Sequence, residues 1–502
     1  MRSPNSILSK IYDTTIFYRK RDLELNIGRN GPEESNLARY TLSLSEIEVL
    51  KDMANQGKVD FSILYQAEDL FLRQRVEPIQ SLLDSWIKGA KAQVNGHDVP
   101  FSEIITWCQE ATNKTDREAL MREARSLCRF LAPFSHSTWK ALLECVEEEL
   151  GYESYFRFCQ AKKGAILSRY PGLALRFLDL SANMYFPMMD RWLGSMKQPL
   201  RLEESSRFDA IYLLGLRYLD HLFPKELKGA AGTKAVLALF EQLFPEWKNI
   251  TVHTQGKKGR QSYCIPLRIP QEIHVIAGPI HGWLDLEALF HELGHAVFFA
   301  NNAPGLRPEE KDYFQSAALS ETFAFLFQLH SMSEPFLTKC FSVNRNVALL
   351  LEGVHKLKFL TLCRRYAAKA YIEYENFIHN RVSHGQDLYA KAMKRYTGFQ
   401  YDPETYLFDL MPDFYSMDYF EAFLAAPCLA VFLQTSFGRN WFLEDGAHAM
   451  MRSWWTEGNR YGLDEFLKRI SVTCPEGMFM SDFMQEINGT LFDNVKKMAQ
   501  IV

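Results

Sequence analysis

The sequence lacks the patterns that mark several classes of protein. Its nine cysteines include no CxxC pair, which argues against a disulfide framework and against a cysteine metal cluster. The net charge of -4, with acids and bases interspersed, provides no general electrostatic field for nucleic acid. The segment MRSPNSILSKIYDTTIFYRKRD has no continuous apolar run, which a secretion signal requires. We therefore predict a cytoplasmic protein with reduced thiols that does not bind nucleic acid.

Long hydrophobic runs are also scarce. The most apolar stretch, AFLAAPCLAVFLQ from Ala422, is shorter than the ~20 residues that a helix needs to cross a bilayer. A buried helix is the simpler interpretation, and we expect no membrane partner. The sequence does contain 47% hydrophobic and 14% aromatic residues in a chain of 502, enough for two or three domains with sizeable cores. We predict a globular protein that is a monomer or homodimer.

Most of the first half shows helical periodicity. Apolar residues recur at spacings of three and four in SEIEVLKDMANQ, FSILYQAEDLFLRQRVEPIQSLLDSWIKGA, TDREALMREARSLCRFLA and RFDAIYLLGLRYLDHLF. No period marks a solenoid repeat, and no low-complexity linker marks a domain border. We predict an N-terminal helical region over residues 1–205 and a second region over residues 206–502, with a soft boundary and interwoven lobes.

The composition changes near residue 248. The segments NITVHTQG, RQSYCIPLRI and EIHVIAG are short, rich in Val, Ile, Tyr and Thr, and separated by a Gly-containing segment and a turn at Pro270. After Gly278 helical patterns resume and run almost to the end of the chain. The predicted fold class is therefore mostly α, with one small β-sheet just before the next helix.

That next helix carries two histidines in an otherwise apolar segment, LDLEALFHELGHAVFFANN, residues 284–302. A spacing of four places His291 and His295 one turn apart on one face, so both rings can reach one metal ion. Glu292 projects about a hundred degrees away, within reach of a water held by that ion. This is the HExxH arrangement, in which the glutamate accepts a proton from the water. The alternative is an ordinary core helix with incidental polar residues.

A third ligand is needed to distinguish the types of zinc site. A metzincin has another histidine six residues after His295, but Asn301 stands there. The following segment, YFQSAALSETFAFLFQLH, contains Glu321 on an apolar stripe, where an unpaired carboxylate would be costly and a cation would stabilise it. The competing interpretation of Glu321 is a buried salt bridge to Arg or Lys. The charged loop that precedes Glu321 contains three further acids, which are more simply interpreted as solvated charges: Glu309, Glu310 and Asp312.

Three protein ligands leave one coordination position open, which is typical of a catalytic rather than a structural zinc site. No cysteine cluster is available to close the site. Two histidines and one glutamate favour one Zn²⁺ per chain, although manganese or cobalt can occupy such a site in vitro.

Several segments resemble one known family. HELGHA, SETFAFLF, SYCIPLRIPQEIHVIAG, DFYSMDYFEAFLAAPCLAVFLQ and EDGAHAMMRSWWTEGNRYGLDEFLKRI resemble the thimet oligopeptidase and oligoendopeptidase F family of zinc metallopeptidases. The resemblance covers about residues 250–470, and the N-terminal half matches only in its helical character. It implies a two-lobed helical body around a deep channel with zinc at its floor, a catalytic region over residues 206–502, and short peptides as substrates.

The resemblance also implies roles for individual residues. Glu292 would be the general base, and zinc would be held by His291, His295 and Glu321. Tyr419 and Tyr415 match the late tyrosines that donate hydrogen bonds to the developing oxyanion, with core aromatics as the competing interpretation. The strand from Ser262 to Leu267 could pair with an extended substrate by edge addition, or be a covered structural hairpin.

The sequence departs from the family pattern at one point. No histidine lies between Tyr401 and Tyr419, where Asp409 and Asp413 occur instead. An ionised acid cannot donate the hydrogen bond that such a histidine supplies, which places the rate and the preferred substrate in question. His379 and His384 come earlier and could reach the site from a loop, but isolated surface histidines are the simpler interpretation.

Three functions are compatible with the sequence. The leading prediction is a zinc-dependent endopeptidase or oligopeptidase that cleaves short peptides with a metal-activated water. A noncatalytic peptide-binding scaffold that retains the metallopeptidase fold is the second, motivated by the missing late histidine. The third is a peptidase dedicated to one biosynthetic peptide.

Overall fold

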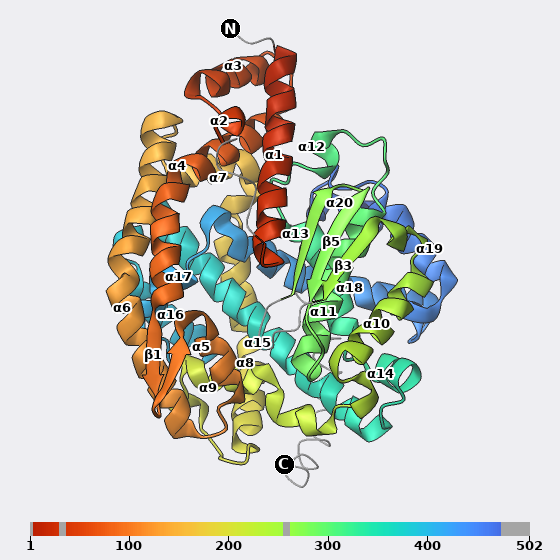
Figure 1. The fold of residues 1–502 in the computed structure, drawn as a ribbon. Coiled ribbons are helices and arrows are strands. Elements are labelled where there is room, and N and C mark those ends of the chain that lie inside the picture. The colour runs from red at the N-terminus through yellow and green to blue at the C-terminus, as the bar shows by residue number, and fades with distance from the viewer. Residues whose placement is uncertain (1–3, 30–36, 255–261, 473–502) are drawn as a thin grey trace.

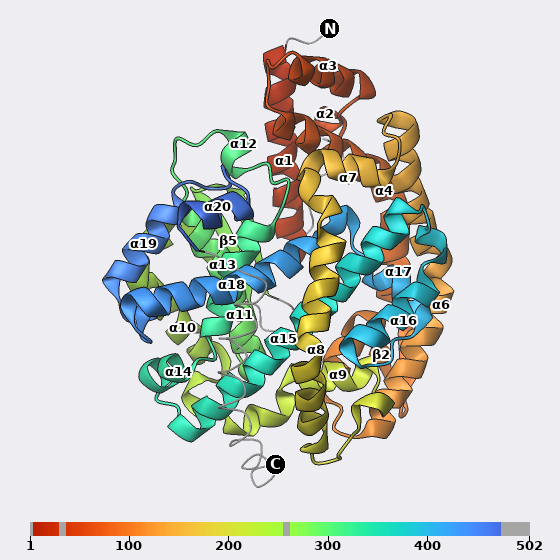
Figure 2. The same cartoon turned by 180° about the vertical axis from the view of Figure 1, so that it is seen from behind.

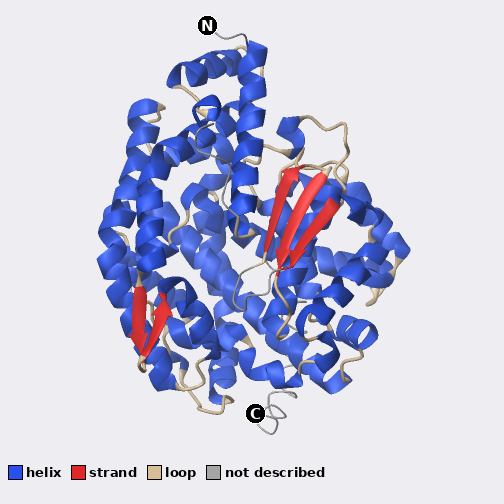
Figure 3. Ribbon diagram, in the orientation of Figure 1, coloured by secondary structure: helices blue, strands red, loops and turns tan. Residues whose placement is uncertain are grey.

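The computed structural model describes residues 4–29, 37–254 and 262–472, and these residues are mostly helical. Helices surround two small sheets that lie on opposite sides of the molecule (Figure 1; Figure 3). The predicted mostly α fold class is confirmed. The long helix α15 (Arg345–Ile378) runs diagonally between the N-terminal helices and the helices around the larger sheet, as seen from both sides (Figure 2).

The first half of the chain forms long helices, several of them with capped N-termini. Ser43 and Glu46 form a capping box at the start of α3, and Asp60 caps α4. The helices of this half are α1 (Pro4–Asn26), α2 (Leu37–Tyr40), α3 (Leu44–Asn55), α4 (Phe61–Gly89), α5 (Ile104–Glu110), α6 (Lys114–Glu144), α7 (Tyr155–Lys163), α8 (Tyr170–Gly194), α9 (Arg207–Gly215) and α10 (Gly229–Leu243). All four segments with predicted helical periodicity lie in these helices, although the last one ends in a 3₁₀ turn, Arg217–Leu222.

A hairpin interrupts the helices of the first half. Strands β1 (Lys91–Val94) and β2 (His97–Pro100) pair antiparallel across a two-residue turn. Asn95 and Gly96 have φ angles of 52° and 81°, as a type I′ turn requires. The sequence prediction of one small sheet missed this second sheet, although an Asn-Gly pair is a strong hairpin signal.

The larger sheet lies where the composition change predicts it. It contains β3 (Ile250–Thr254), β4 (Tyr263–Arg268) and β5 (Glu272–Ala277) in the order β3-β5-β4, with β3 parallel and β4 antiparallel to β5. The central strand β5 is buried along most of its length, and β4 is an edge strand. Leu23 of α1 packs against Ile265 and Leu267 of β4, so α1 covers one face of this edge.

The C-terminal half contains the helices that carry the predicted site. The central ones are α11 (Trp283–Ala300), α13 (Ala318–His330), α15 and α18 (Tyr415–Phe437), and α13 packs against both α11 and α18. The others are α12 (Pro308–Lys311), α14 (Glu334–Phe341), α16 (Gln386–Thr397), α17 (Tyr406–Asp409), α19 (Asp445–Trp455) and α20 (Leu463–Arg469).

Two large hydrophobic cores cross the predicted border between residues 205 and 206. The larger one joins Ala174 of α8 to the C-terminal helices as far as Val472, and the second one joins the N-terminal helices to Phe414 and Met417 near the start of α18. The division into 1–205 and 206–502 stays a prediction.

Among the described residues one helical stretch, Pro412–Phe437, is long and apolar enough to cross a membrane by length and composition alone. It is longer than the apolar run noted in the sequence. It contains α18, which packs against α13 and α15 in the larger core, as expected for a core helix.

Candidate metal centre

The structure brings His291, His295 and Glu321 together. The two histidines lie on one face of α11, and Glu321 reaches them from the first turn of α13. The Oε2 atom of Glu321 lies 3.4 Å from Nε2 of His291 and 3.5 Å from Nε2 of His295. One ligand atom from each of the three side chains lies within 4.8 Å of the others. The Glu321 side chain is 4% exposed and the histidine side chains 14% and 12%, so the rings border solvent above a buried acid.

Gly294 explains how the two helices come close enough. A methyl group at this position would lie 2.8 Å from Cα of Ala324 and 3.0 Å from the carbonyl oxygen of Phe323, both on α13. Real Cβ atoms do not approach backbone this closely, so any larger residue would push α13 away. The glycine between the two histidines therefore sets the distance from α11 to Glu321.

The donor set fits a divalent cation. Tetrahedral ligands at 2.0–2.1 Å from zinc lie about 3.4 Å from one another, which matches the two measured separations. The buried Oε2 atom of Glu321 accepts no hydrogen bond, and the only ion pairs of Glu321 in the described part of the chain are with these two histidines. The alternative of a salt bridge to Arg or Lys is not formed there. Burial would raise the pKa of Glu321, but the two imidazoles outweigh it and hold the pKa well below its usual range.

Glu292 lies beside the ligands in a different environment. Burial, together with the negative charge of Glu321, raises the pKa of Glu292 to about 7, against the lowering effects of His291 and of the backbone amide of Cys264. A carboxylate with a pKa near neutrality can both accept and return a proton. The same environment places Glu292 next to strand β4, since Cys264 belongs to that strand.

Residues behind His291 were missed by the sequence analysis. Nδ1 of His291 lies 2.8 Å from Oε1 of Gln328, and Nε2 of Gln328 donates to the buried Glu287. Glu287 also contacts Lys358 and lies 3.1 Å from Nε2 of His355, both on α15. Two helical spacings could have identified them, because residues four or seven apart lie on the same face of a helix. Glu287 precedes His291 by four residues, and Gln328 follows Glu321 by seven.

The two late tyrosines both lie near the candidate ligands, in different ways. The phenol of Tyr415 donates a hydrogen bond to Oε1 of Glu321 at 2.7 Å, so its proton is directed at a candidate metal ligand. The ring of Tyr419 stacks on Tyr366 with 4.7 Å between centroids and meets Phe325 edge-on at 5.4 Å. Burial and the charge of Glu321 raise the pKa of both phenols well above the usual value, so both keep their protons at neutral pH.

The other acids considered from sequence have partners of their own. Glu309 and Glu310 pair with Arg307, and Asp312 pairs with Arg19. These three acids therefore do not join His291, His295 and Glu321 as candidate ligands. Likewise Asp409 pairs with Arg365 and Lys369, and Asp413 pairs with Lys162.

The two alternative histidines do not supply the missing late donor. His379 is exposed at the end of α15 and lies 3.7 Å from Glu375, and His384 is exposed in the short turn that follows. The surface interpretation of both is the one that the structure supports.

The strand β4 presents an edge towards the site. The backbone amide of Cys264 lowers the pKa of Glu292, which indicates that this N–H points towards Glu292. It therefore points away from β5, the strand that pairs with the opposite edge of β4. Tyr263 is 39% exposed at the start of the strand. An edge with outward main-chain groups beside Glu292 is compatible with pairing to an extended chain.

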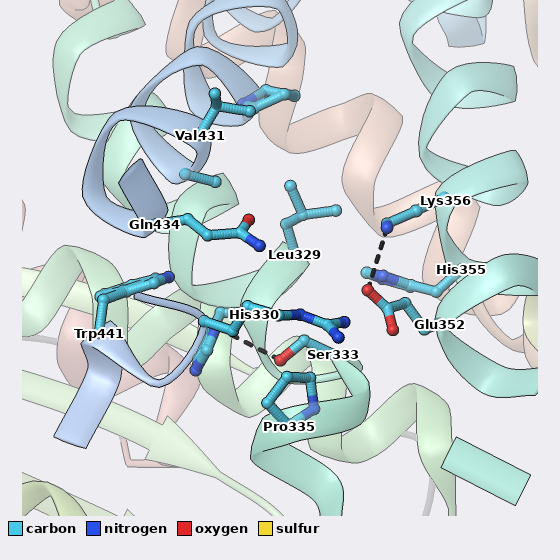
Figure 4. Close-up of a pocket in the computed structure, with 13 residues that line it drawn as sticks. Leu329, His330, Ser333, Pro335, Glu352, His355, Lys356, Val431, Gln434 and Trp441 are labelled. Atoms are coloured by element: carbon cyan, nitrogen blue, oxygen red, sulfur yellow. Dashed lines mark hydrogen bonds and ion pairs between the residues drawn. The ribbon is translucent and has the colours of Figure 1, made fainter. Parts of the chain in front are cut away.

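A separate cavity of about 70 Å³ lies beyond the end of α13 and contains none of the predicted site residues (Figure 4). His330, His355 and Trp441 line it, and the Lys356–Glu352 pair at 3.0 Å stands on its α15 side. His355 thus has the cavity on one side and Glu287 on the other.

Comparison with known proteins gives a fold and no sequence family. No family model matches the sequence, and no curated protein matches it. Solved structures do match: PZ peptidase A with an inhibitor at a TM-score of 0.57, covering 96% of this chain and 86% of that one, with 12% identity. A protein described as an oligoendopeptidase F matches at a TM-score of 0.59, covering 97% and 86%, also with 12% identity. The resemblance noted in the sequence is confirmed at the level of the fold over nearly the whole chain.

Proposed function

We propose that this chain, which shares the fold of PZ peptidase A and oligoendopeptidase F, is a zinc-dependent endopeptidase or oligopeptidase that hydrolyses short peptides in the cytoplasm. The observation that carries the proposal is the convergence of His291, His295 and Glu321 within ligand distance of one another, next to the half-buried Glu292. One Zn²⁺ held by these three residues would polarise the scissile carbonyl and lower the pKa of a coordinated water to about 7.

The side chains of this protein divide the remaining work. Glu292 accepts a proton from the attacking water and returns it to the leaving amine, as a carboxyl with a pKa near 7 can. Tyr419 donates a hydrogen bond to the carbonyl oxygen as it becomes negative. Tyr415 orients Glu321 through the hydrogen bond between them, which differs from the oxyanion role expected from sequence.

The substrate is a short extended peptide rather than a folded protein. The edge of β4 offers main-chain donors and acceptors beside Glu292, so it would hold many sequences in the same register. The expected channel, a monomeric or homodimeric state, and the absence of nucleic acid or membrane partners belong to the same proposal.

The test is Glu292→Gln, which keeps the shape of the side chain and removes the base. Zinc bound per chain should stay at the wild-type value, while cleavage of a quenched peptide library should fall by about 10² to 10⁴-fold, the range that a general base contributes. Glu309→Gln is the matched control, because it makes the same change in an acid that pairs with Arg307 away from the site, and it should cleave normally. Wild-type cleavage by the Glu292 variant would reject this mechanism.

One observation favours a second function. His379 and His384 are exposed at the surface, so neither supplies the late histidine that the family pattern contains. A noncatalytic peptide-binding scaffold that retains the fold is therefore the alternative, and it predicts that the zinc-loaded protein binds library peptides and cleaves none. A peptidase dedicated to one biosynthetic peptide would instead cleave very few members of the library.

A further inference from the structure

The candidate ligands form part of a longer polar seam between three helices. On α11 the residues Glu287, His291 and His295 follow at intervals of four, so they share one face. On α13 Glu321 and Gln328 are seven residues apart and face the same seam. The seam joins the solvent-bordering rings to a deeply buried group of charges on α15.

Gln328 stands at the centre of this seam with both ends of its amide in use. Its Oε1 atom lies 2.8 Å from Nδ1 of His291, and its Nε2 donates to Oε1 of Glu287. Because an amide oxygen can only accept, His291 must present an N–H at Nδ1, which leaves the lone pair at Nε2 free. Nε2 is the atom that faces Glu321.

The direction of the Gln328 amide is itself determined by the groups behind it. Glu287 is 2% exposed, and its carboxylate contacts Lys358 and His355, which are 4% and 1% exposed. An ionised carboxylate cannot donate, so it must receive the NH₂ end of Gln328 and thereby turn the carbonyl end towards His291. Inverting the amide would turn its oxygen towards the carboxylate of Glu287, so two acceptors would face each other in a buried site with no proton between them.

We infer that Gln328 is a positioning residue that fixes the orientation and the Nδ1–H tautomer of His291 for metal binding, with Glu287 holding Gln328 in turn. This inference rests on the proposed zinc function. It differs from the common arrangement in which a carboxylate contacts the ligand histidine directly, because here a neutral amide separates His291 from the anion.

The first test is zinc affinity, measured by competition with a chromophoric chelator, in wild type and in Gln328→Met. Methionine has a similar length but accepts no strong hydrogen bond, so zinc should bind about 10- to 100-fold more weakly. Gln74→Met is the matched control, since Gln74 also uses both ends of its amide, with Leu42 and Tyr40, but lies among the N-terminal helices. It should bind zinc as wild type does.

The exchange variant E287Q/Q328E distinguishes positioning from general packing. It places a carboxylate at position 328 as the acceptor for His291 and an amide at position 287 that can donate to that carboxylate and accept from Lys358. The total charge and the hydrogen bonds to His291 and Lys358 are kept, while the NH₂ group at position 287 now faces His355, so zinc affinity should recover to within about threefold of wild type, well above that of Gln328→Met. A merely structural role for Gln328 predicts no such recovery.

The outcomes separate the two proposals. If wild type binds no zinc, the proposed function fails. If wild type binds zinc and Gln328→Met binds it equally tightly, or if a folded E287Q/Q328E protein binds no better than Gln328→Met, the inference is wrong and the function stands. In wild type itself, nitrogen NMR of labelled histidine should show His291 as the Nδ1–H tautomer without metal, and the other tautomer would overturn the inference without any variant.

Discussion

The two histidines of the candidate site lie one helical turn apart and face the same carboxylate oxygen, yet their other sides differ. His291 is held at Nδ1 by Gln328, behind which lie Glu287 and two basic side chains. The buried Nδ1 atom of His295 has no hydrogen-bond partner among the described residues, and its ring lies nearly parallel to Phe299 at 6.2 Å. One ring is fixed by hydrogen bonds and the other by packing.

This difference separates two requirements of a metal site. Ligation needs only the position of Nε2, which both helical packing and hydrogen bonding can supply. The tautomer, in contrast, is determined only where a partner occupies Nδ1. The hydrogen bond to Gln328 fixes it for His291, whereas for His295 a bound metal ion would have to select it. We expect the first ring to be preorganised and the second to be ordered mainly by the ion.

The largest expected effect is the loss of zinc on removing either histidine ring, and it should be the same for both. His291→Ala and His295→Ala should each remove zinc at micromolar protein concentration, because two remaining ligands hold the ion weakly. Each should lower peptide cleavage by on the order of 10³-fold or more, about 4 kcal/mol in transition-state free energy. Metal content after gel filtration and cleavage rates measure this. A variant that keeps stoichiometric zinc would remove the corresponding histidine from the ligand set.

Sequence alone was sufficient for features that depend on local spacing. The pair His291 and His295 follows from a separation of four, and Glu321 from a single acid on an apolar helix. The three-stranded sheet followed from short β-branched segments between turn residues. These patterns need no knowledge of how distant segments pack.

The remaining features depend on contacts between helices that the sequence does not encode locally. Gln328 and Glu287 are ordinary polar residues until Gly294 allows α13 to approach α11. The contact of Tyr415 with Glu321 depends on the direction of α18, which begins after Asp413 and Phe414, both with positive φ although neither is glycine. Aspartate adopts this conformation more often than most residues, but a left-handed phenylalanine such as Phe414 cannot be anticipated from residue type.

The next prediction concerns stability on the His291 side. Glu287→Leu leaves Lys358 and His355 buried without their carboxylate, which should lower the free energy of unfolding by about 3–5 kcal/mol in urea titrations at pH 7. Phe299→Leu, beside His295, removes apolar contact only and should cost less. A larger loss for Phe299→Leu would reverse the comparison between the two sides.

The effect of Glu287 should also depend on pH. Burial would raise its pKa, but Lys358 and His355 outweigh burial and hold the pKa well below the usual range. A carboxyl with a lowered folded-state pKa contributes its full stability above the unfolded pKa of about 4.3, and this contribution declines as the pH falls further. The difference between wild type and Glu287→Leu should therefore be constant from pH 6 to 7 and narrow below about pH 4. A difference that widens on acidification would contradict the assigned ion pairs.

A smaller effect should act on both rings together. Gly294→Ala places a methyl group against the backbone of α13, and overpacking of this kind costs about 1–3 kcal/mol. Because the shift moves Glu321 away from both histidines, zinc affinity should fall with stability. Gly172→Ala in α8 is the control, since a methyl group there meets nothing within 4 Å. Thermal unfolding and chelator competition give the two quantities, and unchanged values for Gly294→Ala would show that α13 is not held by this contact.

The smallest expected effect concerns the other oxygen of Glu321. Tyr415→Phe removes the hydrogen bond to Oε1 of Glu321, while Oε2 still faces both rings. Zinc should therefore bind only about tenfold more weakly, which is the lower end of the loss in affinity expected when a group that orients a metal ligand is removed. Tyr419→Phe should leave zinc affinity unchanged and lower kcat, because its phenol is assigned to the substrate oxygen rather than to a ligand. Zinc affinity and kcat measured on both variants therefore distinguish a tyrosine that serves the metal from one that serves the reaction. If Tyr415→Phe lowered kcat without weakening zinc, the oxyanion role expected from sequence would be restored to Tyr415, and the hydrogen bond to Glu321 would be a feature of the resting site only.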